Sequence, residues 1–95
     1  MAEADANVGK YPISVASELT GVPEHKLRAF ESAGILEPDR TEGGTRRYSD
    51  AELALIRRAA ELSDRGVNYA GILEILQIEA QGQTEPGEEN EEQQD

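Results

Sequence analysis

The sequence predicts a small, mainly α-helical domain of about four helices with one short two-stranded β-hairpin. Two short amphipathic segments, 15–20 and 23–33, are separated by a tight turn at Gly21. Residues 41–45 (TEGGT) then supply the turn of a hairpin. Two longer segments with helical spacing of apolar residues follow. This order of elements is that of a winged helix-turn-helix domain, in which the hairpin is the β-wing.

The first short helix is expected to begin after Ser14, which is a suitable N-cap residue. Val15, Ala16 and Leu19 then share one face, which we expect to pack on the core.

The second short helix, 23–33, is the expected recognition helix. Pro23 suits its first position, because a backbone N–H there would have no partner within the helix. Leu27 and Phe30 are spaced to point inward, and Gly34 suits the end of the helix. The opposite face, directed to solvent or a groove, carries His25, Arg28, Ala29 and Ser32.

A longer third helix is expected to begin at the segment 49–52 (SDAE), which has the spacing of a capping box. Tyr48 and Leu53 are placed as its hydrophobic staple. We expect this helix to run to Arg65 and to end at Gly66. Arg57 and Arg58, in its middle, are expected to pair with Glu52, Glu61 and similar neighbours.

Asn68 is expected to cap a last helix, in which apolar residues recur at helical spacing. The periodicity breaks at Gln81-Gly82, where order is expected to fade. Ile75 and Ile78 widen the apolar stripe beyond what a small core needs. We therefore expect these two isoleucines to form a partner surface.

The net charge of −11 is distributed unevenly. All nine Lys and Arg lie within 10–78 beside eleven acidic residues, so that region carries only −2, whereas 79–95 holds seven acidic residues and no basic one. We expect a disordered arm at 1–9, a winged helix-turn-helix DNA-binding domain at 10–78 and a disordered acidic tail at 79–95.

The basic residues of the folded region cluster around the recognition helix and the wing. Two adjacent arginines at the end of a hairpin are suited to phosphate, and a helix with basic residues is suited to a groove. The expected DNA-binding residues are His25, Lys26, Arg28, Arg40, Arg46, Arg47 and Tyr48.

Several spaced motifs carry a family resemblance: Leu27-Arg28, Phe30-Glu31, Gly34-Ile35-Leu36 and Arg46-Arg47-Tyr48-Ser49. In this order they resemble the N-terminal domain of MerR-type regulators. Segments 11–16 (YPISVA), 42–49 (EGGTRRYS), 66–68 (GVN) and 70–72 (AGI) resemble the HspR heat-shock repressor group within that superfamily. The resemblance covers roughly residues 11–78.

The resemblance implies a repressor of chaperone or stress genes, with the chaperone DnaK as a co-repressor. The chain departs from the family at Ala29 and Phe30, where the family usually has two aromatic residues after the recognition-helix arginine. The family also continues into a long dimer-forming helix, whereas this sequence turns acidic after Ile78. We therefore expect a monomer in solution that pairs, if at all, on DNA.

Other classes of function find little support. The sequence contains no cysteine, and its only histidine, His25, has no second ligand to complete a metal site. The acidic run 88–92 lacks calcium-loop spacing. Without a nucleophile–base pair or a paired-carboxylate motif, we expect no enzyme, no catalytic residue and no cofactor. No signal peptide or membrane span is evident, so we expect a cytoplasmic, nucleoid-associated bacterial protein.

Three hypotheses follow from these patterns. The first is a sequence-specific DNA-binding regulator, an HspR-like repressor with double-stranded DNA as its partner. The second is a protein-interaction module on the same fold with weakened DNA binding. The third is a small architectural or excisionase-like DNA binder that assembles side by side on repeated sites.

Overall fold

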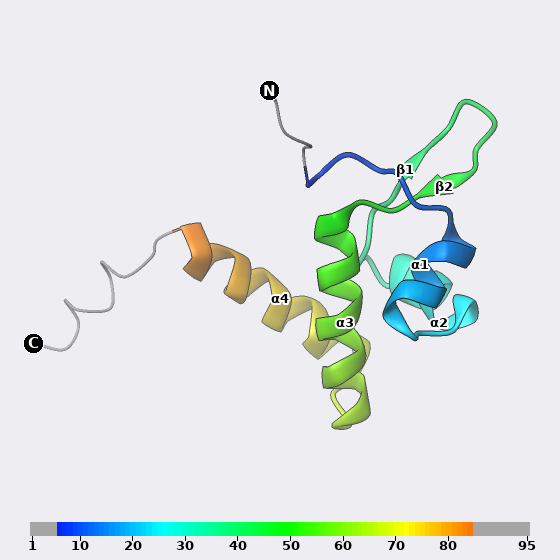
Figure 1. The fold of residues 1–95 in the computed structure, drawn as a ribbon. Helices are drawn as coiled ribbons and strands as arrows, with labels where there is room; N and C mark the ends of the chain where they lie inside the picture. Colours follow the sequence, from blue (N-terminus) through cyan, green and yellow to red (C-terminus); the bar gives the residue numbers. More distant parts are fainter. Residues whose placement is uncertain (1–5, 85–95) are drawn as a thin grey trace, which may run out of the picture.

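The computed structural model describes residues 6–84 of the 95-residue chain. The described elements are α1 (Ile13–Thr20), α2 (Glu24–Ser32), β1 (Asp39–Arg40), β2 (Arg46–Arg47), α3 (Asp50–Asp64) and α4 (Tyr69–Thr84). The two strands pair antiparallel and form the wing. In Figure 1, α1 and α2 lie together on one side of α3, the wing lies beyond the start of α3, and α4 lies on the other side. The predicted fold class, a mainly helical winged helix-turn-helix, is confirmed.

Helix α1 begins two residues earlier than predicted. Pro12 occupies the N-cap position, and its carbonyl accepts hydrogen bonds from the N–H groups of Val15 (3.0 Å) and Ala16 (2.9 Å). Ser14 therefore lies inside the first turn and is exposed, so its predicted capping role is wrong. Ala16 is fully buried, whereas Leu19, predicted on the same face, is 49% exposed.

Helix α2 ends as its sequence predicts. Gly34 has φ +83°, and its N–H donates to the carbonyl of Glu31 (3.0 Å). The next N–H, of Ile35, donates to the carbonyl of Phe30 (2.9 Å). These two bonds make a Schellman motif, which requires a left-handed residue that glycine supplies without strain.

The core lies where α1, α2, α3 and the start of α4 meet. Its largest fully buried side chains are Tyr48, Phe30, Leu27, Leu36, Ile56 and Ile72. Phe30 also packs edge-to-face on Tyr69, with ring centroids 5.4 Å apart. The inward orientation predicted for Leu27 and Phe30 is confirmed, and α2 is thereby fixed against the first turn of α4.

Helix α3 has the predicted capping box: the Ser49 hydroxyl accepts from the Glu52 N–H (3.0 Å), and the Glu52 carboxylate accepts from the Ser49 N–H (3.0 Å). Gly66, with φ +91°, follows its end. Just before α4, the Asn68 side chain accepts from the N–H of Gly71 (2.8 Å), as a capping residue does.

Helix α4 continues to Thr84, past the break predicted at Gln81-Gly82. Arg58 of α3 binds the carboxylate of Glu79 through Nη2 (2.6 Å) and Nε (3.2 Å), which joins α4 to α3 beyond residue 78. One glycine costs a helix only about 1 kcal/mol, so it does not end the helix by itself. Residues 79–84 thus differ from the disordered tail predicted for 79–95, and residues 85–95 lie outside the described part.

Residues 6–9 also differ from the predicted disordered arm. The carbonyl of Ala6 accepts from the N–H of Ala51 (2.9 Å), and the N–H of Gly9 donates to Asp39 Oδ2 (3.0 Å). Tyr11 then forms an isolated β-bridge with Tyr48. This arm, residues 6–11, packs along the wing and the start of α3, while residues 1–5 lie outside the described part. None of the helices within 6–84 combines the length and apolar character needed to cross a membrane.

Candidate nucleic-acid interface

Helix α2 carries three of the predicted contact residues, two of them on its outer face. His25 and Arg28 are exposed and Lys26 is half-buried. Arg28 Nη2 lies 3.4 Å from Glu24 Oε1, one turn earlier on the same helix, and both side chains are substantially exposed. A pair of this kind contributes little and exchanges readily with solvent or another anion. The face is therefore available to a ligand.

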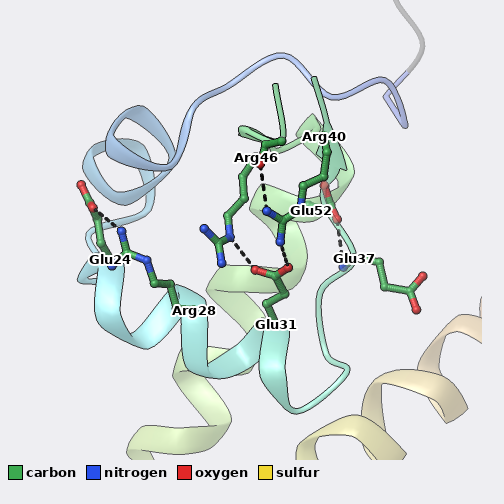
Figure 2. A network of polar contacts seen from close by, with 8 residues as sticks. Glu24, Arg28, Glu31, Glu37, Arg40, Arg46 and Glu52 are labelled. Carbon is green, nitrogen blue, oxygen red and sulfur yellow. Dashed lines mark hydrogen bonds and ion pairs between the residues drawn. The ribbon is translucent and has the colours of Figure 1, made fainter. Parts of the chain in front are cut away.

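The wing is joined to α2 through one carboxylate. Glu31, in the last turn of α2, accepts from Arg46 Nε at 2.5 Å and from Arg40 Nη2 at 2.6 Å. Arg40 also donates through Nη1 to the carbonyl of Gly44 (3.0 Å). Figure 2 shows the two arginines reaching from the two strands to this one side chain. Because each strand supplies one arginine, the hairpin is held to the helix as a unit.

The surroundings of Glu31 act on its pKa in opposite directions. Partial burial acts to raise the pKa of Glu31, but hydrogen bonds from Arg46 and Arg40, together with their positive charges, outweigh burial and hold it below its ordinary value of 4.5. The carboxylate is therefore charged at neutral pH, and the pairing persists there.

Arg47 differs from its neighbour Arg46. In the strand register Arg46 pairs with Arg40 and Arg47 pairs with Asp39, and successive residues of a strand point to opposite faces. Arg47 is half-buried, and it forms no ion pair with any of the described residues 6–84. It is thus a cation of the wing that forms no ion pair with a described side chain, although Asp39 lies opposite it in the register.

Tyr48 was predicted among the DNA contacts, and for this residue the prediction is wrong. Its side chain is fully buried, and its hydroxyl has no hydrogen-bond partner within the described part of the chain. Burial raises the pKa of Tyr48. The physical reason is the staple position before the α3 cap, which places the ring in the hydrophobic core that also contains Leu53. The staple pattern in the sequence was the signal for this burial.

Two further arginines lie away from this interface. Arg58 pairs with Glu61 (3.1 Å) as predicted, and also with Glu79, whereas Arg57 donates to the carbonyl of Leu19 (3.3 Å). The carboxylate of Glu52, the other predicted partner, instead accepts hydrogen bonds from the N–H of Ser49 in the α3 cap and from the N–H of Glu37 (3.2 Å). Both arginines therefore serve the packing of α3.

Glu31 is the site residue that sequence reasoning missed. It is fifteen residues from Arg46 along the chain, so no helical or hairpin spacing relates the two. An acidic residue beside the basic face of the recognition helix was the only available hint. Its role depends on the folding of the wing over the end of α2.

The predicted partner surface, Ile75 and Ile78, is divided by the structure. Ile78 is 61% exposed, whereas Ile75 is half-buried and packs against the core. Neither residue lines the open groove that α3, α4 and the segment after α2 form, whose apolar lining includes Leu55, Leu73, Leu76 and Ala80. The predicted two-residue stripe is therefore reduced to one exposed isoleucine.

Comparisons with known proteins agree with this geometry. The model of a family described as "MerR HTH family regulatory protein" matches residues 11–78. The putative heat shock protein HspR of Streptomyces coelicolor is 44% identical over 72 residues, which are 75% of this chain and 48% of that protein.

Two further relatives are more distant. The HTH-type transcriptional repressor CarH of Myxococcus xanthus is 37% identical over 67 residues, 70% of this chain and 22% of that protein. The HTH-type transcriptional regulator GlnR of Bacillus anthracis is 31% identical over 75 residues, 79% of this chain and 57% of that protein. The chain thus spans between about a fifth and somewhat more than half of the length of these relatives.

Proposed function

This chain belongs to the MerR family of helix-turn-helix regulatory proteins, and on that premise we propose that it is a sequence-specific DNA-binding transcriptional repressor of the HspR type. One observation carries the proposal most directly: the basic outer face of α2 and the arginine-bearing wing are joined through Glu31 into one unit. Such a unit combines a helix of the width that the major groove admits with a hairpin that reaches the flanking backbone.

In the proposed complex, α2 enters the major groove. Arg28 and His25, which are exposed on its outer face, and the half-buried Lys26 contact base edges or adjacent phosphates. The wing lies over the flanking backbone or the minor groove, where Arg46 and Arg47 contact phosphate. Base contacts supply sequence preference, and phosphate contacts supply affinity that depends on salt.

A selection experiment tests the proposal. Duplexes are selected from a random pool with the full chain, and their affinity is compared with that of scrambled duplexes by fluorescence anisotropy at two salt concentrations. We expect a preference on the order of a thousandfold or more for the selected sequence, and weaker binding at higher salt. The Arg65→Ala variant, at the far end of α3, is the matched control and should bind like the wild type.

The interaction-module hypothesis remains the second candidate, and one observation favours it. Arg28, Arg40 and Arg46 already bind carboxylates of the chain itself. If these contacts suppress DNA binding, the selection yields no enriched sequence and the anisotropy shows no preference. An array of direct repeats in a footprint, in place of two inverted sites, would instead support the architectural hypothesis.

The HspR-like part of the proposal concerns targets and partners. We propose chaperone or stress genes as targets and the chaperone DnaK as co-repressor, on the resemblance to the HspR group. Purified DnaK should raise the affinity of the chain for a selected duplex, whereas serum albumin at the same concentration should not. No effect of DnaK would remove the co-repressor and leave the DNA-binding function in place.

A further inference from the structure

Glu31 engages its two arginines differently. Arg40 uses both terminal nitrogens inside the chain, one on Glu31 and one on the Gly44 carbonyl. Arg46 binds Glu31 only through Nε, and neither of its Nη groups has a partner among residues 6–84. Both terminal nitrogens of Arg40 are therefore occupied by contacts within the described chain, whereas the two Nη groups of Arg46 are not.

The free end of Arg46 lies beside the recognition helix. In Figure 2 its unbound nitrogens are on the side of Arg28. The Arg46 side chain is 26% exposed, against 20% for Glu31. The free nitrogens thus lie where the wing meets the outer face of α2.

The planar guanidinium group of Arg46 can bind a second anion while Glu31 holds it. Its five N–H donors lie in one plane, and two parallel donors match two phosphate oxygens. A carboxylate bound at Nε fixes that plane without occupying the Nη pair. An arginine already held in its binding orientation loses less rotamer freedom when it binds its ligand.

We propose that Glu31 is a positioning residue for DNA recognition, which orients the two Nη groups of Arg46 toward a backbone phosphate beside the groove that α2 enters. Through Arg40 the same carboxylate keeps the wing at a fixed place on the helix. This inference rests on the proposed function. It assigns to Glu31 the role of holding the wing and α2 in a fixed relative position. Glu31 itself contacts no DNA.

The opposite role is an internal competitor, in which Glu31 occupies arginines that phosphate would otherwise bind. The two roles predict opposite effects of removing the charge. For a positioning residue, Glu31→Gln lowers affinity for selected and random duplexes alike, because the phosphate that Arg46 contacts is present in both. For a competitor, the same change raises affinity for both duplexes.

The first experiment compares Glu31→Gln with Glu74→Gln, which removes one charge from an exposed position on α4. Each variant is titrated with a selected and a random duplex, after a thermal melt has shown that it is folded. We expect affinity for both duplexes to fall about tenfold in Glu31→Gln, the effect of one lost charged hydrogen bond, and to stay unchanged in Glu74→Gln. Unchanged or increased affinity in Glu31→Gln overturns the inference.

The second experiment uses the adjacent arginines as a matched pair. Lysine keeps the charge but lacks Nε and the fork, so Arg46→Lys should lose most of what Arg46→Ala loses. Arg47 has no such partner within the described residues, so Arg47→Lys should keep most of its affinity. Equal responses at the two positions would show that only charge matters and would overturn the inference.

A direct signal separates failure of this inference from failure of the proposed function. The Arg46 Nε–H resonance should be protected from exchange in the wild type and lose that protection in Glu31→Gln, with or without DNA. If the wild type prefers its selected duplex but both experiments above give the contradicting result, only this inference is overturned. A wild type that discriminates between no duplexes overturns the proposed function and this inference together.

Discussion

At the scale of single residues, the basic side chains of the interface differ in the ion pairs that they form within the chain. Arg28 is tied loosely to Glu24, Arg46 is held by Glu31, and Arg47 forms no ion pair with any residue of 6–84. The three residues are equivalent in charge. Their substitution should nevertheless give different results, because only a contact that depends on base identity changes sequence preference.

The first prediction contrasts Arg28 with Arg47. Arg28→Ala should cost ~1–3 kcal/mol on a selected duplex and relax the preference at one base position. Arg47→Ala should weaken binding to all duplexes alike and lower the salt slope by about one, as loss of a phosphate contact does. Anisotropy titrations against single-base variants at several salt concentrations measure both. Equal losses on selected and random DNA would remove Arg28 from base reading.

The second prediction concerns the pH dependence of folding stability. The folded-state pKa of Glu31 lies below 4.5, because hydrogen bonds from Arg46 and Arg40 outweigh burial. Its contribution to stability is therefore present above about pH 4.5 and is lost as the pH falls through the lower folded-state value. Glu31→Gln should be less stable than the wild type by about 1 kcal/mol at pH 7, and the difference should vanish in acid.

Urea unfolding of both proteins between pH 7 and pH 3 measures that difference. Other titrating groups are shared by the two chains, so their effects cancel in the comparison. A stability difference that stays constant over this range would show that charge on Glu31 is not what holds the arginines.

At the scale of elements, the wing is held from two sides. Glu31 holds it to α2, and the arm 6–11 holds it through the Gly9–Asp39 bond and the Tyr11–Tyr48 bridge. A hairpin with strands of two residues would have little stability alone. Its position therefore depends on these attachments more than on its own ladder.

The third prediction tests the arm. A Cβ atom at Gly9 would lie 2.5 Å from the Arg47 carbonyl oxygen and 2.9 Å from Asp39 Oδ2, so the backbone would have to move. Gly9→Ala should lower the free energy of unfolding by about 1–3 kcal/mol. Gly82→Ala, in α4, meets nothing within 4 Å and should be neutral or slightly stabilising. Thermal unfolding of both variants checks this, and an unchanged Gly9→Ala protein would show that the arm does not pack closely on the wing.

At the scale of the whole molecule, the exposed apolar surface is scattered. Among the described residues, the large hydrophobic side chains that are exposed are Val8, Leu19 and Ile78, which lie on the arm, α1 and α4. A stable protein interface usually buries about 1,200–2,000 Å² of surface in a contiguous patch. Three separated side chains do not provide such a patch.

The fourth prediction follows for the 95-residue chain. At micromolar concentration it should sediment as a monomer, and a second copy should join only on DNA that carries two sites. Sedimentation velocity with and without a two-site duplex measures this. Ile78→Glu should abolish pairing on DNA and leave binding of a single site unchanged. A stable dimer in free solution, undisturbed by Ile78→Glu, would contradict both parts.

The fifth prediction concerns charge at the C-terminal end. Six of the seven acidic residues of 79–95 lie beyond Thr84, joined to a region that holds all the lysines and arginines. Tethered carboxylates compete with phosphate for cations at high effective concentration. Deleting 85–95 should raise affinity for random duplex at low salt, with a gain that shrinks as salt rises. Identical titrations of the two chains at low salt would show that this segment does not reach the interface.

Much of the fold could be predicted because its signals are local. The α3 capping box, the Asn68 cap and the glycine after α2 act through hydrogen bonds between residues at most five apart. Where two local signals compete, prediction failed: Pro12 took the capping position of α1 expected for Ser14. The Pro12 carbonyl accepts the first hydrogen bonds of the helix, which a rule based on capping side chains does not detect.

The sequence by itself determined the helices, the hairpin and the basic residues that lie on α2 and the wing, because periodicity, capping and turn chemistry operate within a few residues. Only the tertiary structure decided that Ile75 packs against the core and that Glu31 holds the wing through Arg46 and Arg40. Burial and ion pairing at these positions depend on elements distant along the chain. Such contacts form only when the elements pack, and no local spacing encodes them.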